Sequence, residues 1–161
     1  MLKVEIICVG KLKERYWREA VEEYSKRLSA YCNFSVTELA EARLSDSPSE
    51  KEIAAALEKE ACLMDKFLSA NGAFRIAMCI EGKTMSSEQL SAKFTEASVR
   101  GHSAVQLFIG SSFGLSDRVK KACDLRLSMS PMTFPHQLAR VMLCEQVYRA
   151  FSIAANSKYH K

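Results

Sequence analysis

The chain has 161 residues, of which 48% are hydrophobic and 26% are charged, and its formal net charge is +4. This length suits one domain with its own core, and this composition excludes an intrinsically disordered chain. The small positive excess is compatible with an RNA partner but does not require one, because solvated surfaces commonly carry such an excess. We therefore expect residues 1–161 to form a single domain.

The cysteines and the apolar runs indicate a cytoplasmic protein. Six cysteines are spread along the chain with no C-x-x-C pair and no Cys/His set at zinc-ligand spacing, so we predict reduced thiols and no metal site. The opening run MLKVEIICVG leads directly into a strand pattern and does not read as a signal peptide. No apolar run approaches the roughly 20 residues of a membrane span, so we expect no membrane association.

Strand patterns and helical patterns alternate through the first half of the chain. The predicted elements are strands over 3–9, 34–40 and 73–80, and helices over 14–30 and from 48 to about 71. The second helix opens on Ser47-Pro48-Ser49-Glu50, which fits a capping box with Pro48 at the first helical position. Asn71-Gly72 is the expected end of that helix.

The second half continues the same alternation. The predicted elements are a helix from Ser86 to Gly101, a strand over 104–109, a short helix from Ser116, a strand around 125–129 and a helix over 136–155. The strands are apolar on both faces, which predicts an α/β fold: a mostly parallel sheet with helices on both faces. Ligands of such sheets bind in loops beyond the carboxyl ends of strands. The loops 81–83, 110–114 and 129–135 qualify.

The loop Gly110-Ser111-Ser112-Phe113-Gly114 directly follows a buried strand. Glycine permits close backbone approach, so main-chain groups could hold a ligand here. An ordinary turn between strand and helix is an equal alternative. The loop is not a phosphate loop, because the Gly-Lys-Ser/Thr ending is missing.

The segment from Ser128 to His136 combines two prolines, two methionines and a phenylalanine, with no charge before the histidine. An apolar loop of this length must pack against another loop or against a flat ligand such as an adenine ring. The residues alone favour a buried connector over a ligand site.

The last helix is apolar on most sides. His136, Arg140, Leu143 and Val147 share one face, whereas Leu138, Val141, Met142 and Ile153 lie away from it. Such a helix must be covered on most sides, and a second copy of the chain in a C₂ dimer would do so. The alternative is a helix that lies centrally within one subunit.

Two sets of polar residues could handle a substrate. His136 and Arg140 are neighbours at the start of the last helix, where a histidine can accept a proton and an arginine can bind a phosphate or carbonyl oxygen. A capping or structural pair is the alternative. The tail with Lys158, Tyr159 and His160 mixes cations and aromatic rings, as RNA-binding surfaces do, although a frayed terminus is the better interpretation of the residues alone.

Longer runs resemble one known family. The chain carries VGKLKERYW, IEGKTMSSE, FIGSSFGLS, LSMSPMTFPHQLARVMLCEQVYRAFSI and a closing YHK. Together they resemble the SPOUT methyltransferases and, within them, the ribosomal RNA large subunit methyltransferase H family. The resemblance covers essentially the whole chain.

The resemblance implies a fold, a cofactor and a set of contacts. It implies a deep C-terminal trefoil knot, which periodicity could not reveal, beside a homodimer interface, and S-adenosyl-L-methionine as cofactor. The cofactor contacts that it implies are Met78, Gly110, Met129, Ser130, Pro131, Met132, Thr133 and Phe134. One departure is Ser111, where the family usually has a second glycine, so its Cβ could narrow the pocket.

The resemblance also implies a reaction: methylation of N3 of a pseudouridine in a 23S rRNA stem-loop on the assembled ribosome. His136 is then the first choice for removing the acceptor proton, with Tyr159 or His160 of a partner subunit second and solvent as the alternative. Arg140 would position a phosphate or a base carbonyl. The rival interpretations are a SPOUT enzyme for another RNA, such as a tRNA base, and a non-catalytic ribosome-associated protein.

Overall fold

The structure is a computed structural model that describes residues 1–161. Its strands are β1 (Lys3–Val9), β2 (Asn33–Leu39), β3 (Ala73–Thr84), β4 (Ala104–Ile109) and β5 (Leu125–Ser128). Its helices are α1 (Arg15–Leu28), α2 (Glu50–Leu68), α3 (Ser87–Val99), α4 (Asp117–Ala122) and α5 (His136–Ala154). The chain thus alternates strands and helices in the predicted order.

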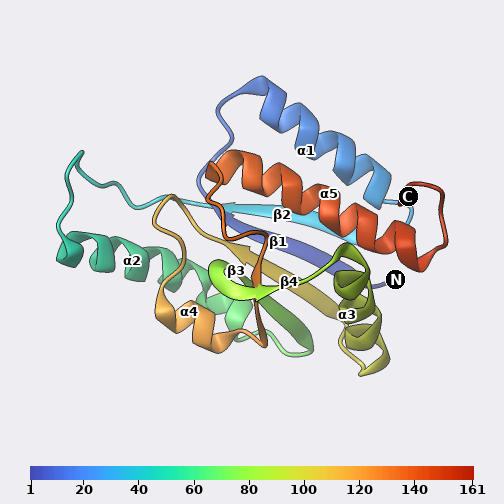
Figure 1. Ribbon diagram of the computed structural model, residues 1–161. Helices are drawn as coiled ribbons and strands as arrows, with labels where there is room; N and C mark the ends of the chain where they lie inside the picture. The colour runs from blue at the N-terminus through green and yellow to red at the C-terminus, as the bar shows by residue number, and fades with distance from the viewer.

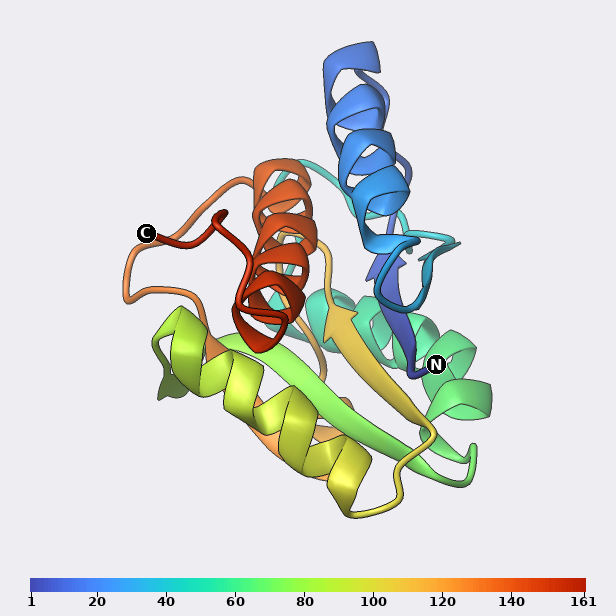
Figure 2. The ribbon, with the colours of Figure 1, turned by 90° about the vertical axis from the view of Figure 1, so that its right-hand side faces the viewer.

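The five strands form one sheet in the order β2-β1-β4-β3-β5, and every neighbouring pair is parallel. Parallel strands require crossover connections, and the helices supply them. Helices α1, α3 and α5 cover one face, and α2 and α4 cover the other (Figures 1 and 2). The predicted α/β architecture is therefore confirmed.

Alternation along the central strands builds a separate core on each face. In β1, Ile6 and Cys8 belong to the larger core under α1, α3 and α5, whereas Ile7 and Val9 belong to the smaller core under α2 and α4. All four side chains are buried. This is the two-sided burial that a continuous apolar strand predicts.

The start of α2 differs from the prediction. The N-cap is Ser49, whose hydroxyl accepts a hydrogen bond from the Glu52 amide, and the helix begins at Glu50. Ser47 and Pro48 lie outside the helix, so the capping box at Ser47 is wrong. Both serines are followed three residues later by Glu, and the local pattern alone does not separate them. At α3, Ser86 caps the helix as expected and forms a capping box with Gln89.

Strand β3 is longer than the predicted 73–80 and continues to Thr84. Its pairing with β5 shifts between Met78 and Lys83, both of which lie opposite Leu127, and it continues with Thr84 opposite Ser128. Gly82 allows this close approach, because a Cβ there would lie 2.8 Å from backbone atoms of Leu127. The sequence did not predict this extension, because the residues after Ile80 are polar and show no apolar pattern. They are held in the sheet by backbone pairing with β5.

Helix α5 packs between α1 and α3 (Figures 1 and 2). Its inner face is buried as expected, and the Ser91 hydroxyl of α3 donates to the Ala150 carbonyl at 2.6 Å. Helices α1 and α3 of the same chain therefore cover part of the α5 surface that the sequence analysis expects a second copy to cover. The apolar side chains that stay half-buried and outside both cores are Leu138, Val141, Met142 and Ile153.

All six cysteines are free thiols, and burial raises the pKa of Cys8 to about 11 and that of Cys144 to about 12. No helix of the structure combines the length and apolarity needed to cross a bilayer.

Candidate active site

A cavity of about 820 Å³, the main cavity, opens at the carboxyl ends of β4 and β5 beside the middle of β3. Its size lies in the range of small-molecule sites. Its walls are residues 78–81, 109–115 and 128–136 apart from Pro131, together with Lys120 and Ala139. The predicted loops 110–114 and 129–135 therefore meet at one place. The third, 81–83, is not a loop but part of β3, and only Glu81 of it reaches the wall.

Most of the predicted cofactor contacts line this cavity. They are Met78, Gly110, Met129, Ser130, Met132, Thr133 and Phe134. Pro131 is the exception: it is exposed and absent from the wall. The backbone turns at this point, where the Ser130 hydroxyl accepts from the Met132 amide at 3.0 Å. The apolar segment is thus a cavity wall and not a connector buried in the core.

Gly110 is required by the packing of its own loop. A Cβ built on Gly110 would overlap the carbonyl group of Gly114 and lie 2.9 Å from the Leu115 amide nitrogen. The loop closes on itself here through a bridge between Ser111 and Gly114. A glycine at 110 therefore allows the tight fold of the loop that forms this part of the cavity wall.

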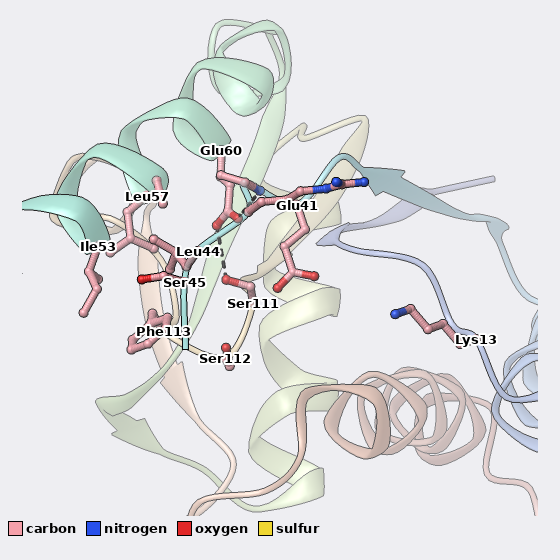
Figure 3. A pocket seen from close by; sticks show the side chains of 13 residues that line it. Lys13, Glu41, Leu44, Ser45, Ile53, Leu57, Glu60, Ser111, Ser112 and Phe113 are labelled. Carbon is pink, nitrogen blue, oxygen red and sulfur yellow. Dashed lines mark hydrogen bonds between the residues drawn. The ribbon is translucent and has the colours of Figure 1, made fainter. Parts of the chain in front are cut away.

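Ser111, the departure from the family pattern, directs its hydroxyl toward α2. The hydroxyl donates to a carboxylate oxygen of Glu60 at 3.2 Å (Figure 3). The other Glu60 oxygen accepts from the Ala42 amide at 3.0 Å. Burial raises the pKa of Glu60 above its ordinary value. Because the serine hydroxyl has this partner, the extra side chain does not fill the main cavity.

Sequence reasoning missed Glu60. The residue lies on the inward stripe of α2, between Ala56 and Met64, and its exposed fraction is 4%. A buried carboxylate needs hydrogen-bond partners. The position of Glu60 on the apolar stripe of the predicted helix was therefore the signal that could have identified it.

His136 lines the main cavity as the first residue of α5. Pro135 precedes it and offers no side-chain cap, so the helix start is open toward the cavity. The ring is half-buried. His136 is the titratable side chain on the last helix that a bound substrate can reach.

Arg140 does not reach the cavity, although it shares a helix face with His136. Its exposed fraction is 2%, and its guanidinium donates to the Glu38 carboxylate at 2.8 Å and to the carbonyls of Val9 and Gly10 at 3.0 Å each. These bonds join α5 to the ends of β1 and β2. Arg140 therefore belongs to the framework beneath the site. Its Nε is buried without a hydrogen-bond partner, and the residue is absent from the cavity wall.

The tail residues lie at the other end of α5 within their own chain. The Tyr159 hydroxyl donates to Glu145 at 3.0 Å, and a ring nitrogen of His160 lies 2.7 Å from Glu88. Burial, and next the bond to Glu145, raises the pKa of Tyr159 to about 12. His136 and Glu145 are separated by about 13 Å along the helix axis. The structure thus keeps Tyr159 and His160 away from the cavity of their own subunit.

The mouth of the main cavity carries one ion pair. Lys120 of α4 lines the cavity and pairs with Glu81, and this bond holds the pKa of Glu81 below its ordinary value. No group of three or more His, Cys, Asp or Glu side chains is placed to hold a metal ion.

Solved structures with a similar fold include methylase family proteins. A methylase family protein from Haemophilus influenzae Rd KW20 superposes with a TM-score of 0.53 at 12% identity, covering 99% of this chain and 70% of the other. A methyltransferase from Legionella pneumophila, solved with bound cofactor SAM, superposes with a TM-score of 0.51 at 17% identity, covering 95% and 66%. At this identity the likeness concerns the fold.

The sequence comparison decides the family. The family described as "Predicted SPOUT methyltransferase" matches residues 2–160. This chain belongs to the SPOUT methyltransferases. Relatives named Ribosomal RNA large subunit methyltransferase H are 46% identical in Bifidobacterium animalis subsp. lactis and 44% identical in Streptococcus equi subsp. zooepidemicus. Each alignment covers 99% of this chain and 100% of the relative. The resemblance drawn from the motifs is confirmed.

Proposed function

We propose that this protein transfers a methyl group from S-adenosyl-L-methionine to N3 of a pseudouridine in the 23S rRNA of the assembled ribosome, in the cytoplasm. The observation that carries the proposal is the main cavity, where residues 78, 110 and 129–134 apart from Pro131 converge from distant parts of a SPOUT chain. The full-length relatives named as ribosomal RNA large subunit methyltransferases support the RNA substrate.

The walls of the main cavity fit the proposed cofactor. Met78, Met129 and Phe134 offer an apolar surface for an adenine ring, and Gly110 lets the loop 110–114 fold against Gly114 so that it forms one wall of the cavity. The sulfonium of the bound cofactor supplies an already activated methyl group. The protein therefore has to hold donor and acceptor in line, keep water out and accept one proton.

His136 is the residue that we propose accepts the proton from the acceptor nitrogen, because it is the imidazole on the cavity wall. We propose that Arg140 acts indirectly, by fixing α5 and hence His136 against the ends of β1 and β2. Tyr159 and His160 would serve the cavity of a partner subunit, since they cannot serve their own.

We propose that the protein is a homodimer with a trefoil knot formed around residues 110–136. Ile80 and Met132 support the dimer, because both line the main cavity and yet are 52% and 71% exposed. Apolar surface at the mouth of a site indicates a covering partner. The four half-buried apolar side chains of α5 named above, which lie outside both cores, also support a covering partner.

Mass spectrometry of large-subunit rRNA tests the proposed function. We expect rRNA from cells that lack the gene to miss one methyl group on a pseudouridine, and purified protein with S-adenosyl-L-methionine to restore it on intact ribosomes. A stem-loop alone should react far more slowly, because a charge of +4 per chain gives little grip on isolated RNA. Unchanged rRNA methylation in the deletion strain would contradict the proposal.

A further inference from the structure

A second hollow of about 520 Å³, the side pocket, lies between α2, the segment after β2 and the loop after β4 (Figure 3). It is lined by Lys13, Glu41, Ala42, Arg43, Leu44, Ser45, Ile53, Ala56, Leu57, Glu60, Ser111, Ser112 and Phe113. None of its α2 residues and none from 41–45 touches the main cavity. None of the proposed cofactor contacts lies in it.

The loop 111–113 is the wall between the side pocket and the main cavity, because Ser111, Ser112 and Phe113 line both hollows. Neighbouring backbone segments pack about 5 Å apart, so a single loop is a thin wall. Two nucleotides joined by one phosphodiester can straddle it when their bases are splayed apart, as bases are in recognised single-stranded RNA. An acceptor base in the main cavity beside His136 therefore leaves the next nucleotide of the strand at the side pocket.

Three exposed cations follow the neighbouring strands at the same edge of the sheet. Lys11 and Lys13 come after β1, and Arg43 comes after β2. The carboxyl ends of both strands lie level with that of β4. None of the three cations forms an ion pair, whereas Arg15 and Arg27 of α1 are each paired with a glutamate of the same helix. Free cations beside a substrate cavity suit the phosphates of a strand that continues along this edge.

The side pocket offers an aromatic face and a hydrogen-bond acceptor for a base. Phe113 is 47% exposed, and bases of any identity stack on such a ring. Glu60 accepts from the Ser111 hydroxyl and the Ala42 amide, which fill two of its roughly four acceptor positions. The remaining positions can accept from an N–H group on the edge of a base.

The charges decide which part of a nucleotide enters. A phosphate inside the side pocket would meet the carboxylates of Glu41 and Glu60, whereas a neutral base meets no such repulsion. Lys13 and Arg43 line the same pocket and are exposed, so the phosphate is favoured outside, beside them. The base therefore points inward and the backbone of the strand lies along the rim.

We propose that the side pocket holds the nucleotide next to the acceptor in the RNA strand, with its base stacked on Phe113 and its phosphate beside Lys13 and Arg43. The acceptor base stays in the main cavity, where its N3 can meet both the donor methyl group and His136. This inference rests on the proposed function, because it extends the substrate of the same site by one nucleotide. The side pocket then holds the strand while the acceptor is turned into the main cavity.

Filling the side pocket tests the proposal by kinetics on intact ribosomes. Ser45 lines the side pocket only and is exposed, so Ser45→Trp places an indole in the hollow without disturbing the core. We expect KM for ribosomes to rise at least about five-fold, the usual effect of losing one stacked base. The affinity for S-adenosyl-L-methionine, measured by calorimetry, should stay within about two-fold. Ser47→Trp, an exposed change in the same segment but outside both hollows, is the control and should leave both values unchanged.

The salt dependence of KM tests the phosphate contacts. Lys13→Gln and Arg43→Gln should each raise KM for ribosomes and reduce the slope of log KM against log salt concentration by about 0.7, the contribution of one phosphate contact on a single strand. A merely structural defect would not change this slope. Lys59→Gln removes an exposed, unpaired cation of α2 outside both hollows and is expected to keep the slope of the unmodified protein.

NMR tests binding without reference to activity. The trinucleotide UpUpU is expected to shift the ¹H–¹⁵N signals of residues 42–45 in the full-length protein in a saturable way. Phe113→Leu should weaken this binding about five-fold or more, because it keeps an apolar side chain and removes the stacking face. Tyr16→Leu removes a ring that is 61% exposed and outside the side pocket, and it should bind UpUpU like the unmodified protein.

Failure of this inference is distinguishable from failure of the proposed function. An unchanged KM in Ser45→Trp would overturn the side-pocket assignment, as would the absence of saturable shifts in 42–45 at about ten-fold excess over a roughly millimolar dissociation constant. A fall in cofactor affinity that matches the rise in KM would also overturn it, because the pocket would then serve the cofactor. Failure of the unmodified protein to bind S-adenosyl-L-methionine would instead overturn the proposed function.

Discussion

Gly110→Ala is expected to reduce the affinity for S-adenosyl-L-methionine by at least about ten-fold. The added Cβ overlaps the Gly114 carbonyl, and both contacting groups are backbone, so no side chain can move aside. The loop must shift, and this also destabilises the fold by about 1–3 kcal/mol, the usual cost of overpacking. Isothermal titration calorimetry measures the first effect, and urea unfolding measures the second.

Gly101→Ala is the matched control for this change, because Gly101 lies outside the main cavity. A Cβ on Gly101 meets nothing within 4 Å, but the residue has a φ of +87°. This variant should lower the free energy of unfolding by the conformational penalty alone, about 1 kcal/mol. Its affinity for the cofactor should be largely unchanged. Equal affinity for the cofactor in Gly110→Ala and the unmodified protein would show that the strand end does not form the binding surface.

Arg140→Met is expected to lower the free energy of unfolding by about 2–5 kcal/mol. The variant keeps the volume but leaves the Val9 and Gly10 carbonyls without their donor and removes the partner of Glu38. Each buried acceptor without a partner costs about 1–3 kcal/mol. Urea unfolding followed by circular dichroism measures this loss.

Arg118→Met provides the comparison. Arg118 pairs with Glu58 and Asp65 at the surface, with 43% of its side chain exposed, so its loss should cost less than about 1 kcal/mol. If Arg140→Met were no more destabilised than Arg118→Met, yet failed to methylate, then Arg140 would act on the substrate and not through the framework.

Hydrophobic periodicity predicted the elements because each face of the sheet has its own core. Apolar runs such as β4 are buried on both sides, and such runs are visible without a structure. Periodicity does not predict a strand segment that is held by backbone pairing but is not buried. The extension of β3 to Thr84 is polar and exposed, and only its neighbour β5 keeps it extended.

The site was predictable to the extent that it consists of loops at strand ends. The apolar segment 128–136 stands out because it requires a covering surface, but its residues alone favour a buried connector. The resemblance to the family is what implies cofactor contacts at Met129 and Phe134, and both residues line the main cavity. For Arg140 the sequence leaves substrate handling and a structural pair open, because it reveals the helix face of the residue but not its depth. Its partners lie on β1 and β2, more than 100 residues away along the chain. Glu60 was missed for the same reason, because Ser111 and Ala42 reach it only in the folded chain.

Hydrogen–deuterium exchange with and without S-adenosyl-L-methionine tests the central claim most directly. We predict that the cofactor slows exchange in 129–135 and 110–114, the two loops that line the main cavity. Saturating binding that leaves the exchange of both segments unchanged would contradict this account.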